Sequence, residues 1–180
     1  MGWWFRIMIL EISNNISITE ISRTDKSSYM RYLTNSEISK YTTRLPCPYK
    51  ESDADLWLNE IEKQKDQHGK YINFAIRKDN NLIGGIGFVD YELNSHKAEL
   101  GYWLAKEFWG NGIISKSVQA FIPYVMKEFK LVRLEAFIFH PNIASQKALL
   151  KNGFELEGVC KKYYFKNGEY FDRLIFAKVL

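Results

Sequence analysis

The sequence predicts a single mixed α/β domain of the α+β type, built on a largely antiparallel sheet. The chain has 180 residues, 46% of them hydrophobic and 16% aromatic, which is enough for one domain with a full core. The predicted order of elements is a strand, helices, three strands, a helix, a strand, a helix and further strands, and not the repeated βαβ units of a doubly wound fold. No repeat, low-complexity segment or linker divides the chain.

The first half of the chain is predicted to form a strand, helices and a strand hairpin. Alternating apolar and polar residues predict strands, and polar capping residues before helical spacing predict helices. The asparagine-rich segment 78–81 suits a hairpin turn. The expected elements begin with a strand at 16–21, a helix from Thr24 or Asp25 to about Thr34, and a short helix near Glu37. A helix from Ser52 or Asp53 to Gly69 and strands at 71–77 and 82–91 follow.

The second half centres on an extended aromatic run, a glycine pair and an amphipathic helix. Glu99 to Leu104 predicts a strand, Gly110 and Gly112 a loop, and apolar residues at three- and four-residue intervals from Ile113 a helix. Asn-Gly after residue 151 ends a later helix, and Asn-Gly at 167–168 joins the last two strands. The remaining expected elements are a strand at 131–140, a helix at 142–151 with Asn142 as its cap, and strands at 154–158, 161–165 and 170–179.

The N-terminal segment 1–10 is apolar, but it is about half the length that spans a bilayer, and Arg6 interrupts it. No small-residue cleavage site follows, so neither a membrane span nor a signal peptide is predicted. Two interpretations stay open: an extra edge strand or homodimer contact, or an upstream extension with the usual start at Met8. We therefore predict an N-terminal extension or extra strand over 1–15, and one domain over 16–180.

Charge and cysteine content narrow the classes of partner. A net charge of +4 fits an anionic ligand or an acidic partner, but it is too mild to predict nucleic-acid binding. Cys47 and Cys160 are far apart in the sequence and lack metal-ligand spacing. We interpret them as reduced thiols of a cytoplasmic protein, and we predict no metal site.

A strand, a glycine-bearing loop and a helix start together predict an anion site. The first turn of a helix has unpaired N–H groups and carries the positive end of the helix dipole, which suits a phosphate. The segment 110–117 also matches a nucleotide-binding P-loop, except that Ser115 replaces the second glycine, and no downstream strand ends in a magnesium-binding Asp. The glycines at 84–87 resemble a dinucleotide fingerprint, but they lie inside a strand, where a bulge that permits close approach is the simpler interpretation.

Four short motifs occur in one order along the chain: Ala98–Leu104, Trp109–Ser115, Asn142–Ser145 and Asn152–Phe154. Together they resemble the GNAT superfamily of N-acetyltransferases, and more narrowly the branch that includes ribosomal-protein N-terminal acetyltransferases. The likeness covers residues 16–179. It implies a sheet splayed at its central strands, with helices on both faces and acetyl-CoA as cosubstrate in the gap.

The resemblance also implies which residues bind acetyl-CoA. Backbone groups near Trp103 and Leu104 would bind the pantetheine arm, and the amides of the glycine loop would cradle the pyrophosphate. Trp109 stands where much of the superfamily has Arg or Gln, and Ile114 where Gly or Ala is usual. The full predicted set is Trp103, Leu104, Trp109, Gly110, Asn111, Gly112, Ile113, Ile114, Ser115, Asn142 and Ser145.

Glu99 and Ser145 are the predicted catalytic residues. Glu99 matches the strand position that carries the general base in some relatives, and its alternative role is a surface ion pair. Leu149 occupies the position where many relatives have an acid tyrosine. Ser145 resembles the serine that contacts the sulfur in the ribosomal-protein branch, and its alternative role is a first-turn helix hydroxyl.

Four other residues are further candidates for a role in the site. His140 is interpreted as a strand-end residue. Asp172 would bind a cationic acceptor or pair with Arg173, and Glu155 or Glu157 are alternative bases.

The function predicted is direct acetyl transfer from acetyl-CoA to a primary amine, with a protein N-terminal amine as the leading acceptor. A polyamine, an amino sugar or an aminoglycoside is the alternative acceptor, and a non-catalytic CoA-binding module is the alternative class.

Overall fold

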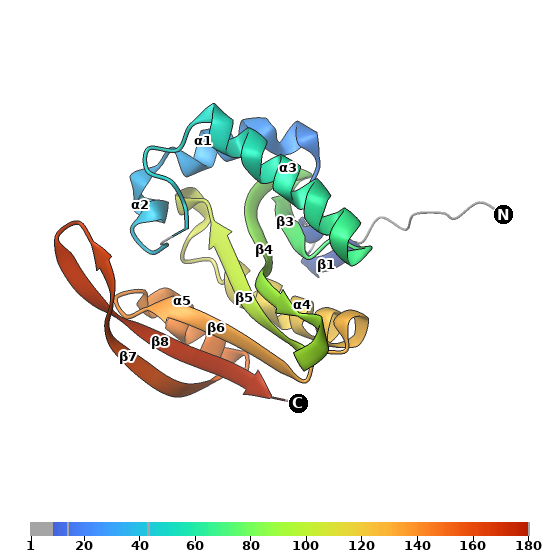
Figure 1. The fold of residues 1–180 in the computed structure, drawn as a ribbon. Coiled ribbons are helices and arrows are strands. Elements are labelled where there is room, and N and C mark those ends of the chain that lie inside the picture. The colour runs from blue at the N-terminus through green and yellow to red at the C-terminus, as the bar shows by residue number, and fades with distance from the viewer. Residues whose placement is uncertain (1–8, 14, 43, 180) are drawn as a thin grey trace.

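The computed structural model describes residues 9–13, 15–42 and 44–179, which form one sheet with helices on both faces (Figure 1). The strands are β1 (Ile9–Ser13), β2 (Ile16–Glu20), β3 (Asn73–Lys78), β4 (Asn81–Glu92), β5 (Lys97–Leu104), β6 (Arg133–Phe139), β7 (Glu155–Lys166) and β8 (Glu169–Val179). The helices are α1 (Lys26–Leu33), α2 (Ser36–Ser39), α3 (Glu51–His68), α4 (Ile113–Phe129) and α5 (Ile143–Lys151). The predicted α+β fold is confirmed.

The sheet is splayed at its centre. Its strand order is β1-β2-β3-β4-β5-β6-β8-β7, and every neighbouring pair is antiparallel except β5 and β6, which run parallel. Those two strands pair only through Lys97–Glu99 and Arg133–Glu135 in the described chain, and they diverge beyond these residues. Figure 1 shows β5 rising toward α2 while β6 stays beside β8. The gap that this divergence leaves confirms the predicted splay.

Two cores, one on each side of the sheet, hold the helices in place. On one face, Val118 and Phe121 of α4 and Leu149 of α5 are fully buried against the strands. On the other face, Tyr29 of α1 and Leu58 of α3 belong to a second buried cluster. Because side chains alternate along a strand, β5 contributes to both faces.

The residues of β5 divide between these two cores. Ala98, Leu100 and Leu104 join the α4 core, whereas Trp103 packs toward α1 with its ring 5.8 Å from that of Tyr29. Glu99 therefore lies on the side of the sheet that faces α1 and α3.

The glycines of β4 allow neighbouring strands to come unusually close. A Cβ placed on Gly84 would lie 2.5 Å from the carbonyl oxygen of Trp103, and one on Gly85 would lie 2.6 Å from the Trp103 indole nitrogen. The register between β3 and β4 also shifts at Ile76/Arg77, as expected for a bulge. The close approach that the sequence predicted is therefore made by the chain's own β5.

Two differences from the predicted elements go beyond small shifts of their end residues. Helix α3 is capped by Lys50 and not by Ser52 or Asp53, because the Asp53 carboxylate accepts a hydrogen bond of 2.7 Å from the Lys50 amide as the third helical residue. The two strands predicted at 154–158 and 161–165 form the single strand β7. Pairing with β8 continues across an irregularity between Cys160 and Tyr164.

The N-terminal end of the described chain is β1, an edge strand that pairs with β2. Residues 1–8 lie outside the described residues, so the division into an extension over 1–15 and a domain over 16–180 stays a prediction. In the described ranges, no helix has both the length and the apolar content to cross a lipid bilayer.

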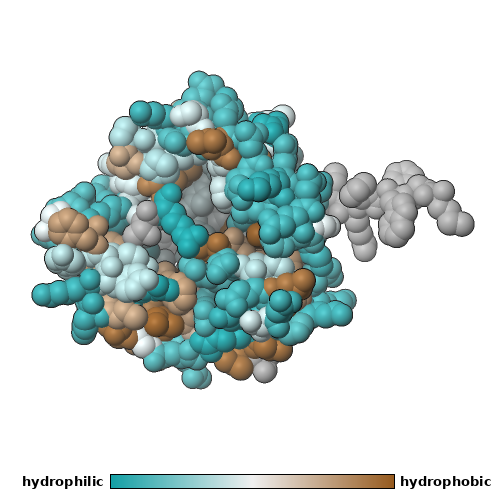
Figure 2. Space-filling model, in the orientation of Figure 1, coloured by the Kyte–Doolittle hydropathy of each residue, from teal (hydrophilic) through white to brown (hydrophobic). Residues whose placement is uncertain are grey.

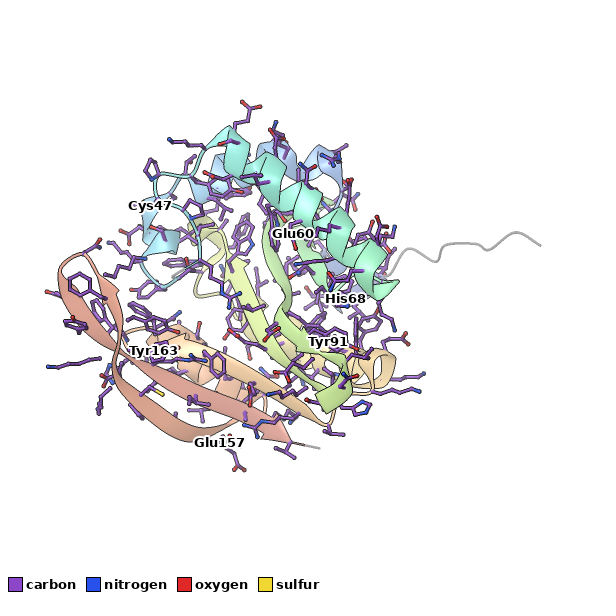
Figure 3. The ribbon with its side chains drawn as sticks, viewed as in Figure 1. Cys47, Glu60, His68, Tyr91, Glu157 and Tyr163 are labelled. Carbon is purple, nitrogen blue, oxygen red and sulfur yellow. The ribbon has the colours of Figure 1, made fainter. Side chains whose placement is uncertain are left out.

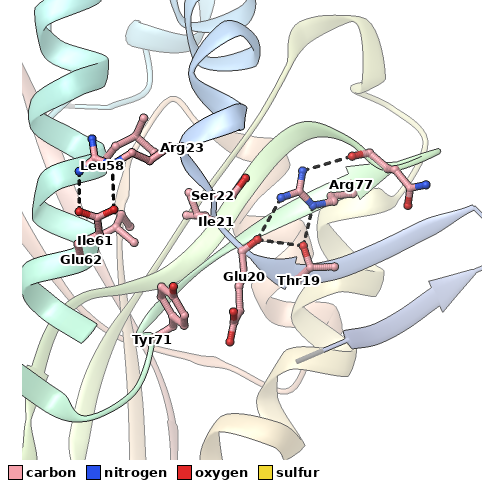
Figure 4. Close-up of a pocket in the computed structure, with 11 residues that line it drawn as sticks. Thr19, Glu20, Ile21, Ser22, Arg23, Leu58, Ile61, Glu62, Tyr71 and Arg77 are labelled. Carbon is pink, nitrogen blue, oxygen red and sulfur yellow. Dashed lines mark hydrogen bonds and ion pairs between the residues drawn. The ribbon is translucent and has the colours of Figure 1, made fainter. Parts of the chain in front are cut away.

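A buried ion pair fixes the start of α1 against the sheet. Arg77 of β3 donates to both carboxylate oxygens of Asp25, at 2.7 and 2.8 Å, and Asp25 is 5% exposed. The same guanidinium donates to the Thr19 hydroxyl and the Glu20 carbonyl of β2 (Figure 4). The pair therefore ties β2, β3 and the α1 start together.

We expect Asp25→Ala to lower the free energy of unfolding by about 3 kcal/mol, because the Arg77 cation would stay buried without its partner. Glu62→Ala is the matched control: it breaks the pair between Arg23 and Glu62, whose side chains are each 54% exposed, and should cost less than about 1 kcal/mol. Urea unfolding of both variants measures the difference. Equal losses would contradict the structural role given to Asp25.

Candidate active site

The peptide groups that line the gap come from alternate residues of β5. The Ala105 amide donates to the Ile83 carbonyl at 2.8 Å, so Trp103 and Ala105 turn their peptide groups toward β4. The peptide groups of Tyr102 and Leu104 therefore face the gap. The resemblance predicted that backbone groups near Trp103 and Leu104 contact the pantetheine arm. The alternation directs the Trp103 groups to β4 instead, and it leaves the groups of Leu104 and Tyr102 facing the gap.

Trp109 lies just beyond the C-terminal end of β5. Its indole nitrogen donates to the Leu104 carbonyl at 2.7 Å, and its ring lies 6.4 Å from that of Tyr41. The Leu104 carbonyl is therefore held by the chain itself, which leaves the Leu104 amide and the Tyr102 peptide groups directed into the gap. This hydrogen bond gives the indole at position 109 a structural role in the loop.

The loop before α4 has the backbone shape that the glycine pair predicted. Gly110 and Gly112 have φ angles of +78° and +70°, in the left-handed region. A Cβ at either position would meet no atom within 4 Å, so the backbone conformation, and not crowding, favours glycine. The Asn111 side chain donates to the carbonyls of Phe108 and Trp109 and so holds the loop in this shape.

The start of α4 presents backbone donors. The helix begins at Ile113, and its first backbone hydrogen bond runs from the Lys116 amide to the Gly112 carbonyl at 3.1 Å. The amides of Ile113, Ile114 and Ser115 precede that bond and project from the helix end. An anion placed there would also meet the positive end of the dipole of a 17-residue helix.

Asn152 braces this helix start from the end of α5. Its side-chain amide donates to the Ser115 carbonyl at 3.0 Å, to the Ser115 hydroxyl at 3.4 Å and to the Ala148 carbonyl at 2.7 Å. The sequence indicated only a helix stop at Asn152. The bridge that Asn152 makes between the end of α5 and the start of α4 was not predicted. Helix termination alone is a sufficient reason for an Asn-Gly pair at that position.

Asn142 and Ser145 lie at the opposite side of the gap, at the start of α5. The Asn142 side-chain oxygen accepts a hydrogen bond of 3.1 Å from the Ser145 amide, so Asn142 caps the helix as expected. The Tyr102 hydroxyl donates a long hydrogen bond of 3.5 Å to the Ser145 carbonyl. Burial raises the pKa of Tyr102 to about 12, so the phenol stays protonated at neutral pH. Tyr102 therefore links β5 to the first turn of α5, a contact that the sequence analysis missed.

Glu99 lies where β5 and β6 begin to diverge. It is registered opposite Asp90 of β4 and Glu135 of β6. Burial raises the pKa of Glu99, the cations of Arg44 and Arg173 oppose that rise, and the neighbouring carboxylates add to it. Among the ion pairs of the described residues none includes Glu99. The arrangement suits a carboxylate that takes up a proton at a pH above the ordinary glutamate range.

The alternative carboxylates are placed less favourably. Glu157 projects from the outer edge strand (Figure 3) and pairs with Arg133, which lowers the pKa of Glu157. Glu155 is exposed on the same strand. Neither has the partly buried position of Glu99.

The remaining two residues, Asp172 and His140, have other contacts. Asp172 accepts from the Lys161 ammonium at 2.8 Å and the Lys162 amide at 2.9 Å. The pair with Arg173, one of its two expected roles, is not among the ion pairs of the described residues. His140 is exposed, and its backbone amide donates to the Asp172 carbonyl.

Other features of the described residues are less suited to binding or catalysis. A hollow of about 400 Å³ lies between β2, β3 and α3 (Figure 4), but its arginines Arg23 and Arg77 are already bonded to carboxylates. No group of three or more His, Cys, Asp or Glu residues that could hold a metal ion occurs in the described ranges. Cys47 and Cys160 are both free thiols.

Comparison with known proteins gives consistent matches. The family model described as the acetyltransferase (GNAT) domain matches residues 15–155. YoaA, an uncharacterized N-acetyltransferase of Bacillus subtilis (strain 168), is 28% identical over 171 residues, which are 95% of this chain and 96% of that protein. The ribosomal-protein-serine acetyltransferase of Escherichia coli (strain K12) is 37% identical over 114 residues, 63% of this chain and 64% of that protein.

Solved structures match across the whole described fold. RimL, a ribosomal alpha-N-protein acetyltransferase in complex with coenzyme A, has a TM-score of 0.87 at 21% identity and covers 96% of this chain and 98% of its own. The acetyltransferase MccE, in complex with acetyl-CoA and AMP, has a TM-score of 0.82 at 22% identity, with 94% of each chain covered. At these identities the likeness supports the fold.

We expect Gly112→Ala to weaken binding of CoA about tenfold, since binding would have to restore a left-handed conformation that costs alanine about 1–2 kcal/mol. Gly69→Ala is the matched control, because Gly69 has a φ of +67° and equally open surroundings at the end of α3, away from the gap. It should lose similar stability and keep the affinity for CoA. Calorimetric titration of both variants measures this, and equal affinities would contradict the assignment of the loop.

Proposed function

This chain belongs to the GNAT acetyltransferase domain family, and we propose that it transfers the acetyl group of acetyl-CoA directly to the N-terminal amine of a protein. The observation that carries the proposal is the divergence of β5 and β6 immediately after Glu99, with the donor-rich start of α4 at one end of the gap. The 37% identity to a ribosomal-protein-serine acetyltransferase supports a protein amine as the acceptor. A homodimer and a cytoplasmic location remain part of this proposal.

The residues around the gap fit acetyl-CoA. When bound, acetyl-CoA supplies an activated acyl group. The amides of Ile113, Ile114 and Ser115 would hold its pyrophosphate, because they project from the start of α4 and precede its first intrahelical hydrogen bond. The peptide groups of Tyr102 and Leu104 face the gap and would hold its pantetheine arm, with the Asn142 side chain at the opposite wall.

Two side chains are assigned roles in moving protons. Glu99 would accept the proton that the acceptor ammonium must lose before its nitrogen can attack. The Ser145 hydroxyl would donate a hydrogen bond to the sulfur as it leaves. Tyr102 and Asn142 act as positioning residues, because both bond to the backbone of Ser145 and thereby hold its turn of α5.

Thiol release from acetyl-CoA tests the function, measured with peptides that have free or blocked N-termini and with a polyamine, an amino sugar and an aminoglycoside. We expect turnover with free N-termini and none with the blocked ones. Turnover only with small amines would replace the protein acceptor by a small molecule. Binding of CoA without turnover on any acceptor would indicate a CoA-binding module.

We expect the dependence of kcat on pH to contain a step at a pKa above the ordinary glutamate value, with activity lost as Glu99 becomes protonated. Burial raises this pKa, and the base acts only in its deprotonated form. Glu99→Gln should remove the step and lower kcat about 100-fold. Glu135→Gln is the matched control, because Glu135 lies at the same register but bonds Arg133. Unchanged rates in Glu99→Gln would exclude it as the base.

Ser145→Ala should lower kcat about tenfold or more without changing the affinity for CoA, since a lost hydrogen bond to the leaving sulfur affects the transition state. Its backbone amide and carbonyl would still bond Asn142 and Tyr102, so the turn of α5 stays in place. Steady-state kinetics and calorimetry separate the two effects. A wild-type kcat would show that Ser145 is only a helix hydroxyl.

A further inference from the structure

Arg173 of β8 is clamped between two aromatic rings. The guanidinium carbon lies 3.4 Å from the centroid of the Phe137 ring and 4.7 Å from that of Tyr163. Tyr163 belongs to the β7–β8 hairpin (Figure 3), where other hydrophobic side chains are exposed among hydrophilic ones (Figure 2). Stacking on aromatic rings leaves the edge of a guanidinium, with its planar set of N–H donors, free to bind a carboxylate with two hydrogen bonds.

The Arg173 side chain forms no ion pair among the described residues, although Glu99 lies within electrostatic reach of it. None of the hydrogen bonds of these residues includes the Arg173 side chain, and its Nε atom is buried without a hydrogen-bond partner. By contrast, Arg77 and Arg133 each bond a carboxylate. The adjacent Asp172 is bonded to Lys161. A buried cationic donor without a partner is unfavourable, so an external anion would complete this site.

Arg173 lies on the same face of the sheet as Glu99. Glu135 of β6 is registered with Glu99, and Phe139, an even number of residues further along β6, is registered with Arg173. Arg173 and Arg44 both act on the charge of Glu99, so both lie within electrostatic reach of it. Arg44 is exposed and donates to the Val89 carbonyl at 3.3 Å.

The two faces of the sheet at the gap therefore differ in the groups that they present. Helix α4, with its donor-rich start, packs on one face, and Glu99, Arg44 and Arg173 gather on the other. An amine that reaches Glu99 from the second face would pass these cations. Asp90 and Glu135 also lie beside Glu99, but Glu135 is already paired with Arg133. Arg44 and Arg173, which form no ion pair among the described residues, would attract an acceptor with a negative charge close to its amine.

We propose that Arg173, assisted by Arg44, binds a carboxylate of the acceptor, so that the preferred substrates are peptides with an acidic side chain next to their N-terminal amine. This inference rests on the proposed function and deepens it. The α-carboxylate of a free amino acid offers the same chemistry, and the experiment separates the two sources.

The test compares two peptides that differ only in Asp or Asn at the second residue, both with an amidated C-terminus, and one free amino acid. For the wild-type protein we expect kcat/KM about tenfold higher for the Asp peptide, mainly through KM. Arg173→Gln should bring the ratio of kcat/KM for the two peptides close to one. Both peptides are measured at a pH above the Glu99 step, because loss of the Arg173 cation also raises the pKa of Glu99. Arg173→Lys should keep part of the preference, because the charge remains but the planar fork is lost.

Arg23→Gln, a remote surface variant, should keep the full preference, and the affinity of each variant for CoA reports whether it is folded. Equal kcat/KM for both peptides in the wild type, or an equal loss on both in Arg173→Gln, would overturn the inference. A preference for the free amino acid over both peptides would reassign the carboxylate to the α-position.

If no peptide turns over, the proposed function fails. The role of Arg173 is then decided by the affinity of the two peptides for the CoA-loaded protein.

Discussion

The functional architecture depends on the short parallel contact between β5 and β6. Three residue pairs hold the strands together, and beyond Glu99 each strand follows its antiparallel neighbour instead, β5 with β4 and β6 with β8. Unpaired peptide groups in the interior of a sheet are costly unless something else bonds them. The chain satisfies one itself, the Leu104 carbonyl, through Trp109. The others make the gap a place where an extended ligand can complete the sheet.

The surrounding contacts hold this gap in one shape. The glycines of β4 let β5 approach closely, Tyr102 reaches across to α5, and Asn152 joins the end of α5 to the start of α4. These contacts connect the two walls of the gap to the helix start that would bind phosphate. The donors are thereby oriented before any ligand arrives, which lowers the cost of ordering them on binding.

Much of this arrangement could be predicted from the sequence, because it depends on local patterns. The glycines at 110 and 112 were expected in a loop, Asn142 as a cap, and the β4 glycines as a site of close approach, and each is observed. The cap of α3 was misplaced by two or three residues, because Asp53 acts from inside the first turn and bonds back to Lys50. Local composition does not distinguish those two positions.

The contacts that the sequence did not predict join segments far apart in the chain. Tyr102 meets Ser145, Asn152 meets Ser115, and Arg173 stacks on Phe137. Each requires the register of β6, β8 or α5 against the rest of the sheet. The environment of Glu99 could not be predicted for the same reason, because Arg44 and Arg173, which act on its charge, are far from it in the sequence. A crystal structure with CoA bound is the most direct test of this cofactor site. We expect the pantetheine arm between β5 and β6 and the pyrophosphate at the amides of residues 113–115. CoA bound elsewhere, with the gap closed by side chains, would contradict it.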